Sequence, residues 1–153
     1  MKDVRKQQII EAFKDWDKLK QKGIWFSGVE GEGLYKKWWD NGQLYFLAHY
    51  KNSELDGEYK KWYENGQFYI LAHCKNGRLD GEYKRWWNNG NPWAIAYYKN
   101  SELEGDYKEW WGNGQFKKLA HYKNGKKNGE YKEWDKNGRL VKHAYYKNGE
   151  EVK

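Results

Sequence analysis

The sequence predicts an all-β protein built as an elongated, twisted solenoid of antiparallel β-hairpins. One observation is a 24-residue unit that recurs without insertion or deletion, with its glycine at Gly33, Gly57, Gly81, Gly105 and Gly129. Another is the Asn-Gly pair inside each unit, which lies between alternating runs and is a strong hairpin signal. A period this strict is typical of repeat architectures, in which each unit packs only on its neighbours.

The composition favours burial between neighbouring repeats over burial in one central core. Hydrophobic residues make up only 38% of the 153 residues, whereas aromatic residues reach 20%. We therefore expect aromatic rings packed between repeats to bury most of the apolar surface. Lys and Arg number 29 against 22 acidic residues, a formal charge of +7. This excess favours anionic partners without naming one. The single cysteine, Cys74, excludes an intramolecular disulfide.

Residues 1–22 precede the repeats and are predicted to form an amphipathic helix. Ile9, Ala12, Phe13 and Trp16 fall on one side of a helical wheel, and Gly23 is a natural stop. We expect this helix to cap the first repeat, because the end of a solenoid leaves a strand edge and an apolar face uncovered. A basic amphipathic helix lying on a membrane surface is the alternative.

Residues 23–153 form the predicted repeat domain. A degraded half repeat occupies residues 24–32, and five full repeats start at residues 33, 57, 81, 105 and 129. A two-residue type I′ turn, with positive φ at both positions, is expected at each Asn-Gly pair such as Asn65-Gly66. A longer second turn then leads to the next hairpin. The last repeat is more polar, as an end cap requires, since Asp135 replaces an aromatic residue.

The expected register divides the side chains of each hairpin between two faces of the sheet. It pairs Tyr63 with Phe68 on one face and Trp62 with Tyr69 on the other. We name the two faces after the residues that recur on them. The tyrosine face carries Tyr35, Tyr59, Tyr83, Tyr107 and Tyr131, and the tryptophan face carries Trp38, Trp62, Trp86, Trp110 and Trp134. An alanine opposite each recurring tyrosine makes room for neighbouring rings, so the tyrosine face is the predicted interior.

The repeated unit resembles the MORN repeat. The resemblance rests on the pattern Tyr-Lys-x-Trp-(Trp/Tyr)-x-Asn-Gly-Gln, followed after a strand by Tyr-Lys-Asn-Gly-x-Leu-Asp-Gly, and it covers about residues 24–149. The likeness is to the variant form found in bacterial antitoxin-like proteins and large DNA viruses. It implies a hairpin solenoid without enzymatic activity that serves in protein–protein scaffolding. Such proteins are frequently dimeric, and some are linked to phospholipid binding.

The sequence contains no residue pattern that indicates catalysis, a cofactor or a metal site. His49, His73 and His121 occupy one repeat position, but neighbouring repeats lie about 9.6 Å apart, too far for two of these histidines to share a metal. A cross-strand partnership with the acidic residue at the position of Glu58 is the expected role. The many glycines stand at fixed turn positions. We therefore expect a protein that is not an enzyme and needs no cofactor.

The tryptophan face is the candidate surface for a protein partner or a second copy of the chain. A row of aromatic side chains this long is rarely left uncovered, and aromatic residues dominate interface energetics. A homodimer is therefore expected, and sequence-specific binding of nucleic acid is not. The candidate contact residues are Trp38, Trp62, Trp86, Trp110, Trp134, Tyr69 and Trp93.

Two alternatives to protein interaction stay open. A peripheral membrane module would bind anionic phospholipid through a lysine ladder, although acidic rows interleave with it and could leave only a solvated, compensated surface. The ladder consists of Lys36, Lys60, Lys84, Lys108 and Lys132. An aromatic cage for choline or sugars is disfavoured by the lack of a secretion signal. With no signal peptide and no apolar stretch of spanning length, an intracellular, cytoplasmic protein is expected, in the virion or host cytoplasm if the gene is viral.

Overall fold

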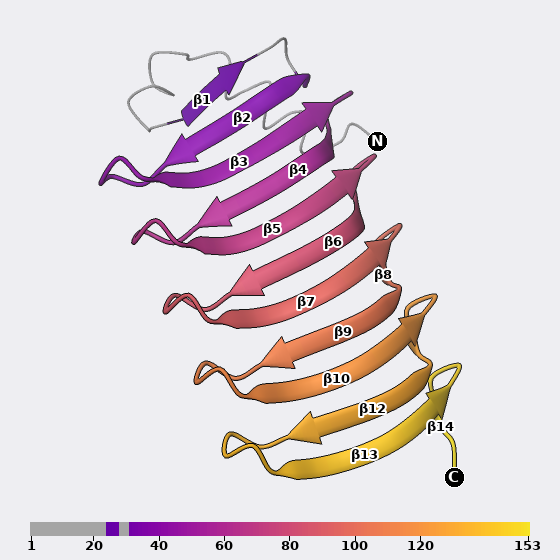
Figure 1. Ribbon diagram of the computed structural model, residues 1–153. Helices are drawn as coiled ribbons and strands as arrows, with labels where there is room; N and C mark the ends of the chain where they lie inside the picture. Colours follow the sequence, from indigo (N-terminus) through magenta and orange to yellow (C-terminus); the bar gives the residue numbers. More distant parts are fainter. Residues whose placement is uncertain (1–23, 28–30) are drawn as a thin grey trace.

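The computed structural model describes residues 24–27 and 31–153, which form one antiparallel sheet of 14 strands. The strands follow one another in chain order across an open sheet (Figure 1). They are β1 (Ile24–Ser27), β2 (Gly33–Trp38), β3 (Leu44–Lys51), β4 (Glu54–Trp62), β5 (Phe68–Lys75), β6 (Arg78–Trp86), β7 (Pro92–Lys99), β8 (Glu102–Leu103), β9 (Gly105–Trp110), β10 (Phe116–Lys123), β11 (Lys126–Lys127), β12 (Gly129–Trp134), β13 (Leu140–Lys147) and β14 (Glu150–Glu151). The predicted all-β antiparallel class is confirmed.

The helix predicted for residues 1–22 lies outside the described residues and stays a prediction. Within residues 24–27 and 31–153, no helix is long and apolar enough to cross a membrane. The first strand of the sheet, β1, pairs only with β2 in the described part of the chain.

Each strand that begins a hairpin is bent at the recurring glycine. On β3, one residue between Ala48 and Tyr50 faces three residues of β4, so the register shifts there. Gly57 lies in this bend with a φ of 109°, a conformation that favours glycine. A Cβ atom at this position would also lie 3.3 Å from the Cβ of His49. In the later repeats the same bend separates the short strands β8 and β11 from β9 and β12.

The Asn-Gly turns differ from the prediction. In the loop after β4, the Tyr63 amide donates to the Gln67 carbonyl (2.8 Å) and the Gly66 amide donates to the Tyr63 carbonyl (3.0 Å). Only Gly66 has a positive φ, of 86°, and Asn65 does not. The connection is therefore a three-residue loop in which a type I turn precedes a glycine bulge. The expectation of a two-residue type I′ turn at these pairs is wrong.

The two-residue turn occurs instead at the second connection of each repeat. Between β5 and β6, Lys75 pairs with Arg78, and both central residues have positive φ, 50° at Asn76 and 76° at Gly77. This is the type I′ pattern. The expectation of a longer second turn is wrong, because Asn-Gly supplies the glycine that either kind of turn needs. The three-residue loops and the type I′ turns lie at opposite ends of the strands (Figure 1).

The loop and a register shift beside it place the first two residues of each returning strand on faces other than those predicted. Tyr59 lies opposite Ala72 and Lys61 opposite Ile70, as predicted, but Trp62 then pairs with Phe68 across a register shift. The predicted Tyr63–Phe68 and Trp62–Tyr69 pairs are therefore wrong. Phe68 belongs to the tryptophan face, and Tyr69 packs on Tyr63 with ring centroids 4.9 Å apart.

Two rows of side-chain hydrogen bonds join consecutive repeats at the strand ends that carry the three-residue loops. The side chain of Asn65 accepts from the Gln67 amide (3.0 Å) and donates to the Asn88 carbonyl of the next repeat (3.0 Å). Asn41, Asn89 and Asn113 make the same pair of contacts. Beside them, the indole of Trp39 donates to the Trp62 carbonyl (3.2 Å), and Tyr63, Trp87 and Trp111 repeat this contact. The asparagine thus holds both its own turn and the next one.

The most buried residues lie on the tyrosine face, in agreement with the prediction that this face is the interior. The alanine of each repeat is almost inaccessible, from 0% exposed at Ala48 to 6% at Ala144. Rings pack edge to face across it: the centroids of Tyr35 and Phe46 are 5.6 Å apart, and those of Phe46 and Tyr59 are 5.2 Å apart. Small residues between large rings let neighbouring repeats interlock.

The turn of the fifth repeat is held differently from those of the four before it. Asp135, which stands where earlier repeats have Trp or Tyr, accepts hydrogen bonds from the amides of Asn137 (2.9 Å) and Arg139 (3.0 Å) and so caps its own turn. Among the described strands, the outer side of β13 pairs only with the two-residue β14. Val141 is consequently 62% exposed. The lysine at 142 protects this edge, since charged side chains hinder strand addition.

We predict that Asn65→Ala destabilises the protein by about 1–2 kcal/mol, because two hydrogen bonds are lost from one side chain. The matched variant is Asn137→Ala, in the equivalent turn that has no following repeat. Its free energy of unfolding should change by less than about 0.5 kcal/mol. Urea denaturation followed by tryptophan fluorescence measures both values. Equal losses would contradict the bridging role of the asparagine.

Candidate interaction surfaces

The five tryptophans of the tryptophan face alternate with smaller apolar residues along the sheet. Phe68 lies between Trp62 and Trp86, with ring centroids at 5.3 and 5.7 Å. Phe116 lies in the same way between Trp110 and Trp134, at 5.3 and 5.9 Å. The corresponding residue is Leu44 before Trp62 and Pro92 before Trp110. We call Trp38, Leu44, Trp62, Phe68, Trp86, Pro92, Trp110, Phe116, Trp134 and Leu140 the aromatic row.

The aromatic row is partly open to solvent. Phe68 is 40% exposed and Phe116 is 42% exposed, while the five tryptophans are half-buried. Successive rings are stacked on or tilted against each other along the sheet. The row therefore presents little free ring face to a flat ligand such as a sugar, and it suits another protein surface better.

Tyr69 and Trp93, predicted to lie with the five tryptophans, lie on the tyrosine face instead. The Tyr69 hydroxyl accepts from Nη2 of Arg85 (2.6 Å). Trp93 stacks on Trp87, with centroids 3.9 Å apart and planes 5° from parallel. The register shift at each three-residue loop explains both displacements. The same shift brings Phe68 and Phe116 into the aromatic row, where the expected register did not place them.

The predicted lysine ladder, Lys36 to Lys132, is largely neutralised by carboxylates two residues earlier on the same strand. Lys60 lies 2.9 Å from Glu58, and Lys84 lies 2.8 Å from Glu82. Lys132 lies 2.9 Å from Glu130. The Lys60 ammonium holds the pKa of the Glu58 carboxyl below its ordinary value. At Lys108 the pattern breaks, because Asp106 contacts Nδ1 of His121 at 2.5 Å instead.

Two of the three histidines lie opposite a carboxylate, as predicted, whereas His49 lies opposite Leu34. His73 lies opposite Glu58 in the ladder, and His121 lies opposite Asp106. In the described part of the chain, no group of three or more His, Cys, Asp or Glu residues could hold a metal ion. Cys74 is buried, in the position where other repeats have tyrosine.

The tyrosine face carries cations that lie against its own aromatic rings. The guanidinium of Arg85 lies 3.5 Å from the Trp93 ring centroid and 4.9 Å from that of Tyr69. Lys61 lies 5.8 Å from the Tyr45 centroid. The rings of Tyr45, Tyr69 and Trp93 therefore already have a cation of the protein beside them. An external choline-like group would have to displace it, which argues against the aromatic-cage alternative.

In the last two repeats the charges of the tyrosine face form ion pairs. Glu109, only 8% exposed, accepts from Nζ of Lys117 (2.9 Å) and from the Tyr107 hydroxyl (3.2 Å). Burial and the Glu109 carboxylate together raise the pKa of Tyr107 well above its ordinary value. The neighbouring repeat pairs Tyr131 with Glu133 in the same way. The sequence analysis missed this network. The signal is a paired exchange in the fourth repeat: Glu109 replaces the cation of the earlier repeats, and Lys117 replaces their aromatic residue.

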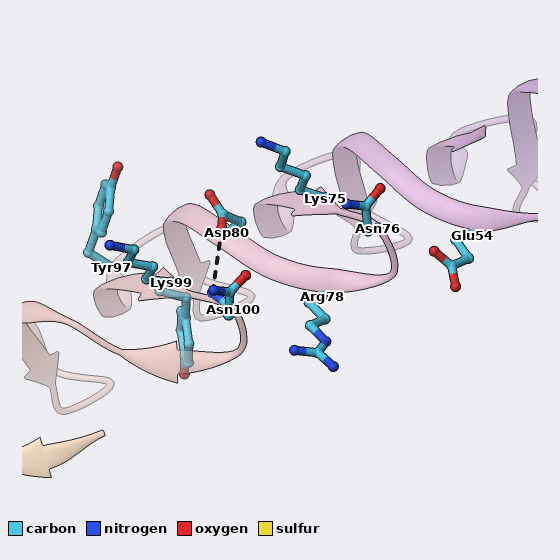
Figure 2. Close-up of a pocket in the computed structure, with 9 residues that line it drawn as sticks. Glu54, Lys75, Asn76, Arg78, Asp80, Tyr97, Lys99 and Asn100 are labelled. Atoms are coloured by element: carbon cyan, nitrogen blue, oxygen red, sulfur yellow. Dashed lines mark hydrogen bonds between the residues drawn. The ribbon is translucent and has the colours of Figure 1, made fainter. Parts of the chain in front are cut away.

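A hollow of about 860 Å³ lies at the strand ends that the type I′ turns connect (Figure 2). Lys75, Lys99 and Tyr97 line one side of it, and Arg78 and Glu54 lie on the other side of the ribbon (Figure 2). Asp80, also in its wall, accepts from the Asn100 amide at 3.4 Å. With charges of both signs and wide contact with solvent, this hollow favours no single class of ligand.

We predict that Glu109→Gln destabilises the protein by about 1–3 kcal/mol, because it removes the partner of Lys117 at a nearly buried site. Glu58→Gln is the matched variant, since Glu58 also pairs with a lysine but is much more exposed. It should cost less than about 1 kcal/mol. Thermal and urea unfolding compare the two variants. The buried network would lose its proposed importance if Glu58→Gln cost as much as Glu109→Gln.

Comparison with known families agrees with the repeat pattern seen in the sequence. The model of one family, described as the MORN repeat variant, matches five times, at residues 31–52, 55–76, 79–100, 103–124 and 127–148. These matches cover most of the described sheet and recur with the same 24-residue period. A search of curated proteins found no match to the chain.

Proposed function

The chain belongs to the family of MORN repeat variants, and from this premise we propose that it is a non-enzymatic protein-interaction and assembly module that associates with a second copy of itself. The observation that carries the proposal is the aromatic row of the tryptophan face. Its two phenylalanines are two-fifths exposed, although they lie in the middle of a row of rings that spans the sheet.

The surroundings of the aromatic row have the anatomy of a protein interface. Rings form its centre, and charged pairs such as Lys60–Glu58 and Lys84–Glu82 flank it. An apolar centre with a polar rim is the usual arrangement of such surfaces. Because the same row would face itself across a two-fold axis, a homodimer needs no second kind of surface. The five tryptophans and the two phenylalanines are the proposed contact residues.

Peripheral binding to an anionic membrane is the second candidate function, and the lysine ladder beside the aromatic row favours it. Three of the five ladder lysines are already paired with a carboxylate of the same strand, which weakens their attraction for lipid headgroups. For this reason we rank membrane binding below self-association. Flotation with vesicles that contain phosphatidylserine separates the two functions: co-flotation of the protein at low salt would favour the membrane.

We also propose that residues 1–22 cap the sheet at β1. The support is the amphipathic sequence pattern together with the position of β1, which pairs with β2 alone among the described strands. Without a cover, the second side of β1 would offer a free edge for aggregation.

We predict that the double variant Phe68→Ser/Phe116→Ser weakens self-association at least tenfold, because the aromatic centre of an interface supplies most of its binding energy. Val141→Ser/Val152→Ser is the matched control. It also removes two exposed apolar side chains (62% and 54% exposed), but they lie at the last strands. Sedimentation equilibrium measures the dimer constant of each protein, and far-UV circular dichroism checks the fold.

The wild-type protein should sediment as a dimer, and the control variant should follow it. A wild-type chain that stays monomeric at every concentration tested, or a control that dissociates as readily as the phenylalanine variant, would contradict self-association through the aromatic row.

A further inference from the structure

The tyrosine face differs in charge between its two halves. At one strand position, the first three repeats carry Lys37, Lys61 and Arg85, and the last two carry Glu109 and Glu133. In the second half two cations have a carboxylate nearby: Lys117 lies 2.9 Å from Glu109, and Lys118 lies 4.0 Å from Glu133. In the first half no such pairing is found within the described residues.

The neighbours of these three cations explain why they have no carboxylate partner. Across the strands, Lys61 faces Phe46 and Ile70, and Arg85 faces Ile70 and Ala94. Along the chain, each cation has a tyrosine two positions before it and a tyrosine or tryptophan two positions after it. Three half-buried cations therefore lie in an aromatic surface that has no counter-charge among the described residues. An incoming carboxylate would meet them with little competition from water, which strengthens the attraction.

Two of these cations, Arg85 and Lys61, are held in place by tyrosine hydroxyls. Nη2 of Arg85 donates to the Tyr69 hydroxyl (2.6 Å), while Nε is buried and has no acceptor among the described residues. Burial alone would lower the pKa of Lys61, but the Tyr59 hydroxyl and nearby tyrosines outweigh it and raise that pKa above its ordinary value. Packing against rings restricts both side chains, so less conformational entropy is lost when they bind an anion.

We infer that the first three repeats form a docking surface on the tyrosine face for an acidic segment of another protein, with Lys37, Lys61 and Arg85 as its contacts. This surface is separate from the aromatic row and does not depend on self-association. The cations recur once per repeat, about 9.6 Å apart. A flexible chain that carries several Asp or Glu residues can bring a carboxylate to each of them.

The charge of the chain's own N-terminal part argues against that part as the occupant. Residues 1–23 contain seven Lys or Arg and four Asp or Glu, a net charge of +3. Such a segment would be repelled by a cationic surface rather than drawn to it.

The rings of this surface argue against single-stranded nucleic acid. Binding of that kind depends on aromatic faces on which bases stack. The Trp93 ring has Trp87 stacked at 3.9 Å and the Arg85 guanidinium at 3.5 Å. Two groups at such distances cannot share one face of the ring, so both faces are occupied. The cations can still bind a carboxylate, whereas the Trp93 ring has no free face on which a base could stack.

Fluorescence anisotropy with labelled deca-glutamate tests the inference at 50 mM salt. The wild-type protein should bind the probe, and Lys37→Gln/Lys61→Gln/Arg85→Gln should weaken binding at least tenfold. The matched control, Lys75→Gln/Lys99→Gln/Lys123→Gln, removes the same charge from exposed lysines at the turn edge and should change affinity less than threefold. The charge-preserving variant Lys37→Arg/Lys61→Arg/Arg85→Lys should stay within threefold of the wild type.

Several outcomes would overturn the inference. They are a wild-type protein that does not bind deca-glutamate, equal losses in the two glutamine variants, or a tenfold loss in the charge-preserving variant. Tighter binding of oligothymidylate or of phosphatidylserine vesicles at the same three residues would assign the surface to another class of partner. Sedimentation of each variant separates this result from the proposed function, because the dimer should persist when deca-glutamate binding is lost.

Discussion

The structure depends on the three-residue loop that closes each hairpin. The loop shifts the register at Trp62–Phe68, and an irregularity between Lys61 and Trp62 then restores it, so that the first two residues of the returning strand change face. Phe68 and Phe116 thereby complete the aromatic row, and Tyr69 and Trp93 are placed beside the cations of the tyrosine face. The asparagine of the loop transmits the same geometry to the next repeat through its bond to that repeat's carbonyl group. One local turn, copied five times, thus separates two surfaces of different chemistry.

The described residues form a sheet with a single layer, in which stability must come from contacts within the sheet itself. Here the stabilising contacts lie within the sheet and recur with the repeat: alanine rows that admit neighbouring rings, indole groups that donate across repeats, and cations against aromatic faces. These interactions connect nearest neighbours only. Stability should therefore accumulate repeat by repeat, as in other solenoids. The last repeat keeps the fold but replaces the bridging aromatic residue by Asp135, which caps its own turn.

Much of this fold could be predicted from the sequence because the period is strict and the alternation is clear. The pairing of Tyr59 with Ala72 follows from these two features alone. The kind of turn could not be predicted, since Asn-Gly supplies a residue with positive φ to a type I′ turn and to a glycine bulge alike. The difference is one residue of register, which is enough to assign Tyr69 to the wrong face. The Glu109–Lys117 pair could have been found, because the two substitutions occur in the same repeat.

The central claim is that the two faces have separate roles, the aromatic row in self-association and the cationic part of the tyrosine face in binding an acidic segment. Oxidative footprinting with mass spectrometry tests it most directly. Raising the protein concentration should protect Phe68 and Phe116 from oxidation, and adding deca-glutamate should protect Tyr69 and Trp93 instead. If both treatments protected the same residues, or if neither changed the oxidation of its expected pair, the division into two functional faces would be contradicted.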